Sequence, residues 1–142
     1  VRFCECVTRR AVGGLFAMFC GVLLSWSDGA EHVIRMTVAP KSVTTPIAML
    51  LAVQIGGVAA LAAVYVMITG VLGAIFGPAL LSRCGVHSPE ARGMSLGVTA
   101  HAVGTSVALQ ESDECGAFAA LAMSLMGVAT AVFLPLAVSL VA

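Results

Sequence analysis

The feature that most constrains this sequence is the length of its stretches without charge. No charged residue occurs from position 42 to 82, and none from 115 to 142. Because about 20 consecutive apolar residues cross the hydrocarbon core of a bilayer as a helix, both stretches are long enough to span a membrane. Charged residues make up only 10% of the chain, whereas soluble globular domains contain roughly 25%. These observations predict an integral membrane protein.

Two long apolar segments are predicted to be membrane-spanning helices, at residues 57–82 and 117–142. In the first of them, Gly73 and Gly77 lie four residues apart, a spacing that lets helices in lipid approach closely. A shorter apolar segment at residues 11–26 precedes them. The sequence therefore predicts an all-α, multi-pass membrane protein with one transmembrane domain.

The predicted domain covers residues 11–142, and residues 1–10 are left as an unassigned N-terminal tail. Two polar stretches interrupt the apolar sequence of this domain, and they resemble each other. "KSVTTPIAM" at 41–49, the first polar stretch, aligns with "HAVGTSVAL" at 101–109, the second, at an offset of 60. At this offset, eight of the 22 positions from 41 to 62 are identical to their partners.

Residues 41–54, which contain the first polar stretch, are too few to cross a bilayer as a helix, so we expect them to be interrupted or re-entrant. If the second polar stretch behaves in the same way, each is followed by one true span. Two such units in succession lie in opposite orientations. The expected fold is therefore a helical bundle built as an inverted repeat, the plan of many secondary transporters, with a binding site where the interrupted segments meet.

The first polar stretch has the features of an anion-binding helix end. Thr45 is predicted to be the N-cap and Pro46 the first helical residue. The free N–H groups and partial positive charge of such an end attract an anion. Ser42 and Thr44 add hydroxyls, and Lys41 adds a positive charge. The alternative interpretation is a plain helix cap in a polar loop.

The second polar stretch contains His101, with Thr105 four residues later. An ionisable residue within a membrane is a candidate functional residue, here for proton relay or anion binding. The alternative is a neutral histidine bonded to a neighbouring helix. The hydroxyls of Ser95, Thr99 and Ser106 are expected to bond back to their own backbone.

Other functions find little support. The net charge is zero, which gives no electrostatic basis for binding nucleic acid. "GMSLG" at 93–97 matches the serine-hydrolase nucleophile pattern, but a polar loop precedes it where that pattern needs a strand, so we do not expect an enzyme. The five scattered cysteines do not have metal-site spacing. The acidic residues Glu111, Asp113 and Glu114 are more typical of solvated surface than of a cation site. No cofactor or metal is expected.

The sequence resembles the C-terminal half of the LrgB/CidB family of bacterial inner-membrane proteins. The resemblance runs from Ala39 to the end, in the segments "APKSVTTPIAM", "GVLGAIFGP", "ARGMSLGVTAHAVGTSVAL" and "GAFAALAMSLMGVATAVFLP". Members of the family are normally longer, with further helices before this region. We therefore expect this chain to be an N-terminally incomplete copy, located in the bacterial inner membrane.

The resemblance implies two functions. The first is transport of small organic anions of the pyruvate and glycolate class, because related proteins include the plastid glycolate/glycerate translocator and bacterial members are tied to pyruvate movement. The alternative is antiholin-like or holin-like regulation of murein hydrolase activity and autolysis, together with a small LrgA/CidA-type membrane partner. Either function is compatible with a homo-oligomer.

The resemblance also implies a set of residues for binding a small carboxylate. The motifs of the family carry over onto Lys41, Ser42, Thr44, Thr45, His101, Gly104 and Thr105. This chain departs from the family motif at one position: many members have a positively charged arginine where this chain has Val107. Lys41 would then have to supply part of the missing positive charge.

Overall fold

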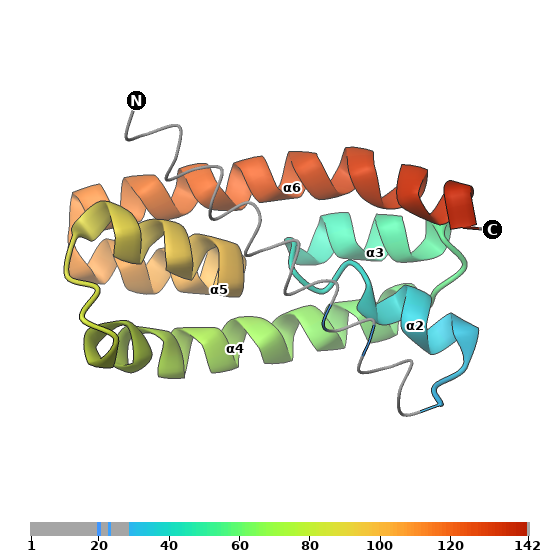
Figure 1. Cartoon of the computed structure of the whole chain (residues 1–142), viewed down its shortest axis with the longest axis horizontal. Helices are drawn as coiled ribbons and strands as arrows, with labels where there is room; N and C mark the ends of the chain where they lie inside the picture. The colour runs from blue at the N-terminus through green and yellow to red at the C-terminus, as the bar shows by residue number, and fades with distance from the viewer. Residues whose placement is uncertain (1–19, 21–22, 24–28, 142) are drawn as a thin grey trace.

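The computed structural model describes residues 20, 23 and 29–141 of the chain. Within this part, all regular secondary structure is helical, which confirms the predicted all-α class (Figure 1). The helices are α2 (His32–Val38), α3 (Thr45–Gln54), α4 (Ala59–Arg83), α5 (Pro89–Glu111) and α6 (Asp113–Val141). The predicted tail 1–10 and nearly all of the first apolar segment 11–26 lie outside the described residues.

Two of the described helices, α4 and α6, are long and apolar enough to cross a membrane, and they correspond to the predicted spans. They run in opposite directions along the long axis of the molecule (Figure 1). Only 22% and 28% of their apolar windows are buried inside the molecule. Large apolar side chains such as Ile75, Phe76 and Phe133 are exposed along them. Contiguous exposed apolar surface of this kind requires an apolar surrounding, which a bilayer provides.

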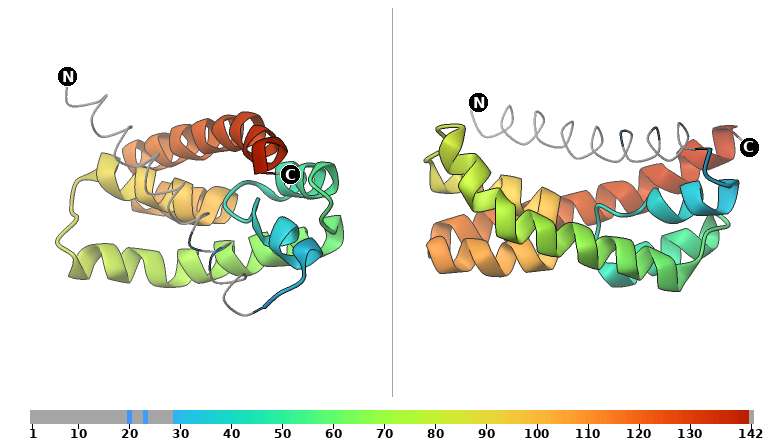
Figure 2. Two further views of the ribbon diagram at one scale, coloured as in Figure 1. Left: turned by 45° about the vertical axis from the view of Figure 1, so that its right-hand side comes forward. Right: turned by 90° about the horizontal axis from the view of Figure 1, so that it is seen from below.

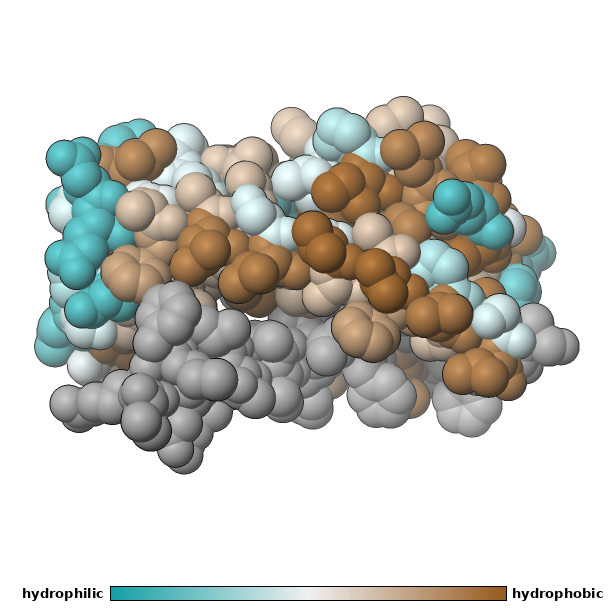
Figure 3. All heavy atoms as spheres, turned by 90° about the horizontal axis from the view of Figure 1, so that it is seen from above, coloured by the Kyte–Doolittle hydropathy of each residue, from teal (hydrophilic) through white to brown (hydrophobic). Residues whose placement is uncertain are grey.

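On the face drawn in Figure 3, the hydrophilic residues lie mainly toward the ends of the molecule. Apolar residues cover its middle in Figure 3, and hydrophilic residues gather at the end where α5 joins α6. The α5 helix lies at this end, whereas α2 and α3 lie at the opposite end (Figure 2). This distribution is the one expected of a helical protein whose long axis crosses an apolar layer.

The α5 helix reverses its direction at His101. This residue has φ 46° and ψ −125°, which is far from helical geometry. The Nε of Arg92 lies 2.6 Å from a carboxylate oxygen of Glu111, 19 residues later. A straight helix would separate two such residues by about 28 Å. Residues 89–111 therefore form a helical hairpin, the α5 hairpin, with arms 89–100 and 102–111 and both ends at one end of the molecule (Figure 1).

Glycines bring the two arms of the α5 hairpin close to each other and to α6. A Cβ atom at Gly104 would collide with the carbonyl oxygen of Leu96 on the other arm. A Cβ atom at Gly97 would collide with the backbone of Ala119 on α6. The buried residues of this junction form one apolar cluster: Leu96, Ala108, Cys115 and Ala119.

The predicted close packing at Gly73 and Gly77 is confirmed, and the partner is the first arm of the α5 hairpin. A Cβ atom at Gly73 would lie 2.9 Å from the Cβ of Ala100, and one at Gly77 would lie 2.8 Å from Cδ2 of Leu96. Because larger side chains would push the hairpin away, the small residues of α4 set its position.

At the opposite end, Thr37 joins α2 to the start of α4. Its hydroxyl donates to the carbonyl of Val33 over 2.7 Å and accepts from the backbone N–H of Val58 over 2.9 Å. The α3 helix is held by a second buried cluster of Val43, Ala48 and Val66, with Ile47 packed against it. The turn between α2 and α3 therefore has a fixed place, with the start of α3 directed toward the middle of the molecule (Figure 1).

Candidate functional site

The first polar stretch forms the turn before α3 and the first residues of that helix. Thr44 is the N-cap, with φ −65° and ψ 149°, and its carbonyl accepts the N–H of Ala48 at 2.9 Å. The prediction that Thr45 caps the helix is wrong by one residue, because Thr45 already has helical geometry and Pro46 follows it. The Thr44 side chain makes no capping hydrogen bond. The amide groups at this helix end are therefore not satisfied by that hydroxyl.

The second polar stretch begins at the tip of the α5 hairpin, where His101 is 3% exposed. Its Nε2 lies 3.2 Å from the backbone carbonyl oxygen of Lys41. Since a carbonyl oxygen can only accept, Nε2 carries the hydrogen, and Nδ1 of the neutral ring is an acceptor. Nδ1 faces α4 at Gly70, where a Cβ atom would lie 3.4 Å away. His101 thus links the tip of the hairpin to the first polar stretch.

The two candidate residues after His101 belong to the second arm of the hairpin. Gly104 is buried against the first arm, where it permits the close approach of the two arms. The hydroxyl of Thr105 donates to the carbonyl of His101 over 2.8 Å. The predicted backbone bonding of the other hydroxyls is confirmed: Ser95 donates to Ala91, Thr99 to Ser95 and Ser106 to Val103.

The structure therefore brings Lys41 and His101 together, with the remaining candidates next to them in the chain. Ser42 is 6% exposed, and its hydroxyl makes no hydrogen bond within the described residues. Helix α3 begins at Thr45, four residues after Lys41, and the second arm of the α5 hairpin begins directly after His101. The two helices run toward opposite ends of the molecule (Figure 1). Each helix N-terminus carries a partial positive charge, and the first turn of α3 contains no acidic residue to neutralise it. This arrangement can attract and hold a small anion.

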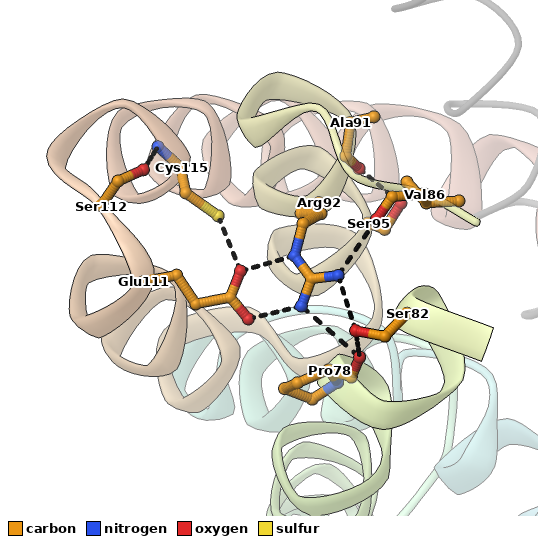
Figure 4. Close-up of polar contacts among 9 residues, drawn as sticks. All are labelled: Pro78, Ser82, Val86, Ala91, Arg92, Ser95, Glu111, Ser112 and Cys115. Atoms are coloured by element: carbon orange, nitrogen blue, oxygen red, sulfur yellow. Dashed lines mark hydrogen bonds and ion pairs between the residues drawn. The ribbon is translucent and has the colours of Figure 1, made fainter. Parts of the chain in front are cut away.

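The sequence did not predict the polar network around Arg92, which ties together three parts of the described chain (Figure 4). The guanidinium binds both carboxylate oxygens of Glu111, over 2.6 and 2.7 Å. Its remaining donors reach Ser82 Oγ at 3.2 Å, the carbonyl of Val86 at 3.0 Å and the carbonyl of Pro78 at 3.4 Å. All five N–H donors of the guanidinium thus have acceptors. Glu111, interpreted from the sequence as solvated surface, is exposed and is also half of an ion pair.

The ion pair changes the proton affinity of both side chains. Hydrogen bonding from Arg92 lowers the pKa of Glu111, and desolvation opposes this effect only in part. The same bond raises the pKa of Arg92. The pair could have been found only by assuming the reversal at His101, because Arg92 and Glu111 then lie at nearly equal distances along the chain from the tip. Among the described residues, no cluster of His, Cys, Asp or Glu could hold a metal ion.

Comparison with known proteins identifies similar chains. A profile of the LrgB-like family matches residues 2–140. The Bacillus subtilis protein YxaC is 36% identical over 127 residues, which cover 89% of this chain and 55% of that protein. The holin-like protein CidB of Staphylococcus epidermidis is 33% identical over 105 residues, covering 74% of this chain and 46% of that protein. The antiholin-like protein LrgB of Bacillus cereus is 26% identical over 132 residues, covering 93% and 57%.

The chain spans about half the length of the curated relatives that it matches. No solved structure matches it.

Proposed function

The chain belongs to the LrgB-like family, and we propose that it acts in a bacterial inner membrane as a holin-like or antiholin-like protein. Two of its relatives carry these names. The two helices that are long enough to cross a membrane support this location. The resemblance to the LrgB/CidB family implies regulation of murein hydrolase activity and autolysis with a small LrgA/CidA-type membrane partner.

A second candidate function, passage of small organic anions of the pyruvate and glycolate class, is favoured by one observation. This is the contact between His101 Nε2 and the carbonyl of Lys41, four residues before the start of α3 and directly before the second arm of the α5 hairpin, two short helices that run apart. In transporters built from inverted repeats, broken helices direct their N-termini at an anionic substrate near the bilayer midplane. Passage of these anions would change the membrane energetics on which autolysis depends, so the two functions are compatible.

In this second function, a carboxylate would accept hydrogen bonds from the free amides at the start of α3 and of the second hairpin arm. The hydroxyls of Ser42 and Thr44 would add donors, and Lys41 would supply a positive charge that Val107 does not. Movement of the α2–α3 segment against the α5 hairpin would expose the anion to each side in turn. No covalent bond changes in this cycle.

Reconstitution in liposomes tests both candidates. Uptake of labelled pyruvate and glycolate would be measured beside release of a large trapped dye, for the native chain and for His101→Ala and Thr45→Val. The matched control is Ser106→Ala, because the Ser106 hydroxyl is exposed and bonded to its own backbone.

Saturable uptake that His101→Ala and Thr45→Val abolish, without dye release and with Ser106→Ala unaffected, is the result expected of anion passage. Dye release that all variants share would instead favour holin-like permeabilisation. Absence of both activities would refute the proposal that this chain suffices for either.

A further inference from the structure

We infer that Arg92 is a positioning residue, which closes the base of the α5 hairpin with Glu111 and thereby fixes His101 at its tip. This inference rests on the proposed role of the His101 site in binding an anion. Its evidence is separate, since it comes from the polar network at the far end of the hairpin (Figure 4).

The geometry of the hairpin makes its base and its tip interdependent. Arg92 lies in the first turns of one arm and Glu111 at the end of the other, each about 14 Å along its arm from the reversal. At the reversal, His101 has a φ of 46°, a conformation that a residue with a side chain keeps only when its surroundings hold it. The arms must therefore be held together, and the bidentate ion pair does so at the end away from the tip.

The same guanidinium fixes the hairpin to α4. It donates to the carbonyl of Pro78 within α4 and to the carbonyl of Val86 just after it. Helix α4 also carries Gly70, which faces Nδ1 of His101. Arg92 thus sets the hairpin against the helix that forms one wall around His101.

An ordinary surface ion pair would not have these features. Exposed pairs contribute little, because water competes for their hydrogen bonds. Here the Arg92 side chain is 13% exposed and the Glu111 side chain 27%, and every donor of the guanidinium is used by the protein. At the repeat offset of 60, the corresponding residues of the other repeat are His32 and Leu51, which cannot form such a pair.

The test reads the ring of His101 directly, without requiring transport. The full chain would be labelled with ¹⁵N-histidine in lipid bilayers, and His101→Ala would identify the His101 signals among those of the three histidines. The native chain should show one tautomer, with hydrogen on Nε2. Arg92→Gln should convert this signal into a mixture of both tautomers. Arg83→Gln is the matched control, because it removes the same positive charge at an exposed position at the end of α4.

Two further variants separate the functions of the guanidinium. Arg92→Lys keeps the charge but loses the fork that binds several acceptors, so it should also disturb the tautomer. The exchange R92E with E111R restores the pairing of the arms, but a carboxylate at position 92 cannot donate to the carbonyls of Pro78 and Val86. We expect this double variant to recover only part of the native signal.

An unchanged His101 signal in Arg92→Gln and Arg92→Lys, at native helix content by circular dichroism, would overturn the inference. If Arg92→Gln loses helix content, the His101 signal of Arg92→Lys at native helix content decides alone. Where uptake is measurable, Arg92→Lys should raise the KM for the anion roughly tenfold, the equivalent of one net hydrogen bond. A disturbed His101 signal without anion uptake in any variant would support the positioning role and refute anion passage.

Discussion

Nε2 of His101 lies 3.2 Å from the carbonyl oxygen of Lys41, and the two residues are 60 positions apart. This separation equals the offset at which their two polar stretches align. Lys41 precedes a short helix and then the long α4, whereas His101 precedes the short second arm of the hairpin and then the long α6. The two stretches thus occupy equivalent places in the chain and contact each other. Their inverted, re-entrant course through a membrane stays a prediction.

The backbone at His101 leads to a first prediction, that His101→Gly is more stable than His101→Ala. Both variants lose the bond to Lys41, but glycine adopts a φ of 46° without the steric cost that alanine incurs. The difference in the free energy of unfolding should be about 1 kcal/mol. Thermal unfolding in detergent, followed by circular dichroism, measures it. Equal stability of the two variants would mean that the left-handed conformation is not retained when the imidazole is removed.

A second prediction concerns the glycines that face neighbouring helices. Gly97→Ala places a methyl group against the backbone of Ala119, which cannot move aside, so it should destabilise the protein by about 1–3 kcal/mol. Gly70→Ala is the matched control, because its Cβ would make only ordinary contacts of 3.4–3.5 Å. Both changes gain helix propensity, so the difference between them reports packing. Similar melting temperatures for the two variants would contradict the close approach of α5 to α6.

The spans and the polar stretches could be predicted because they depend on local composition. A long run without charge predicts α4 and α6 whatever surrounds it. The start of α3 follows from its threonines and Pro46, and the prediction is wrong by only one residue. In such segments, the local chemistry and the fold favour the same structure.

The sequence predicts an interrupted or re-entrant second polar stretch, but the residue at which the chain reverses, His101, could not be predicted, because the cause of the reversal is tertiary. The sequence around it contains helix-compatible residues, and the reversing residue itself is not a glycine or a proline. The arms are held by contacts between residues far apart in the chain, namely Gly104 with Leu96 and Arg92 with Glu111. The family resemblance places Gly104 at the binding site. In the structure, Gly104 packs against the backbone of Leu96 on the other arm of the hairpin.

A third prediction follows from Arg35 in α2. The Nε of this residue is buried and has no hydrogen-bond partner among the residues that the structure describes. An unsatisfied buried donor costs about 1–3 kcal/mol, so Arg35→Met, which replaces Nε with a methyl group and removes the rest of the guanidinium, should raise the melting temperature in detergent. Arg83→Met, at an exposed position, should leave it unchanged. A fall in stability for Arg35→Met would show that the guanidinium has gained a partner under those conditions.

The final prediction is a loss of stability in acid that depends on Glu111. Because Arg92 holds the pKa of Glu111 below its ordinary value of 4.5, the ionised carboxylate stabilises the folded state. This stabilisation is complete at pH values above 4.5. It is lost as the pH falls through the lowered pKa that Glu111 has in the folded protein. Since the Glu111 side chain is 27% exposed, the effect should be on the order of 1 kcal/mol. Glu111→Gln should therefore melt below the native chain at pH 7, and the gap should narrow as the pH falls below 4.5. Glu114→Gln, an exposed neighbour, should follow the native curve throughout. A gap between Glu111→Gln and the native chain that persists unchanged into acid would mean that the ion pair with Arg92 does not stabilise the fold.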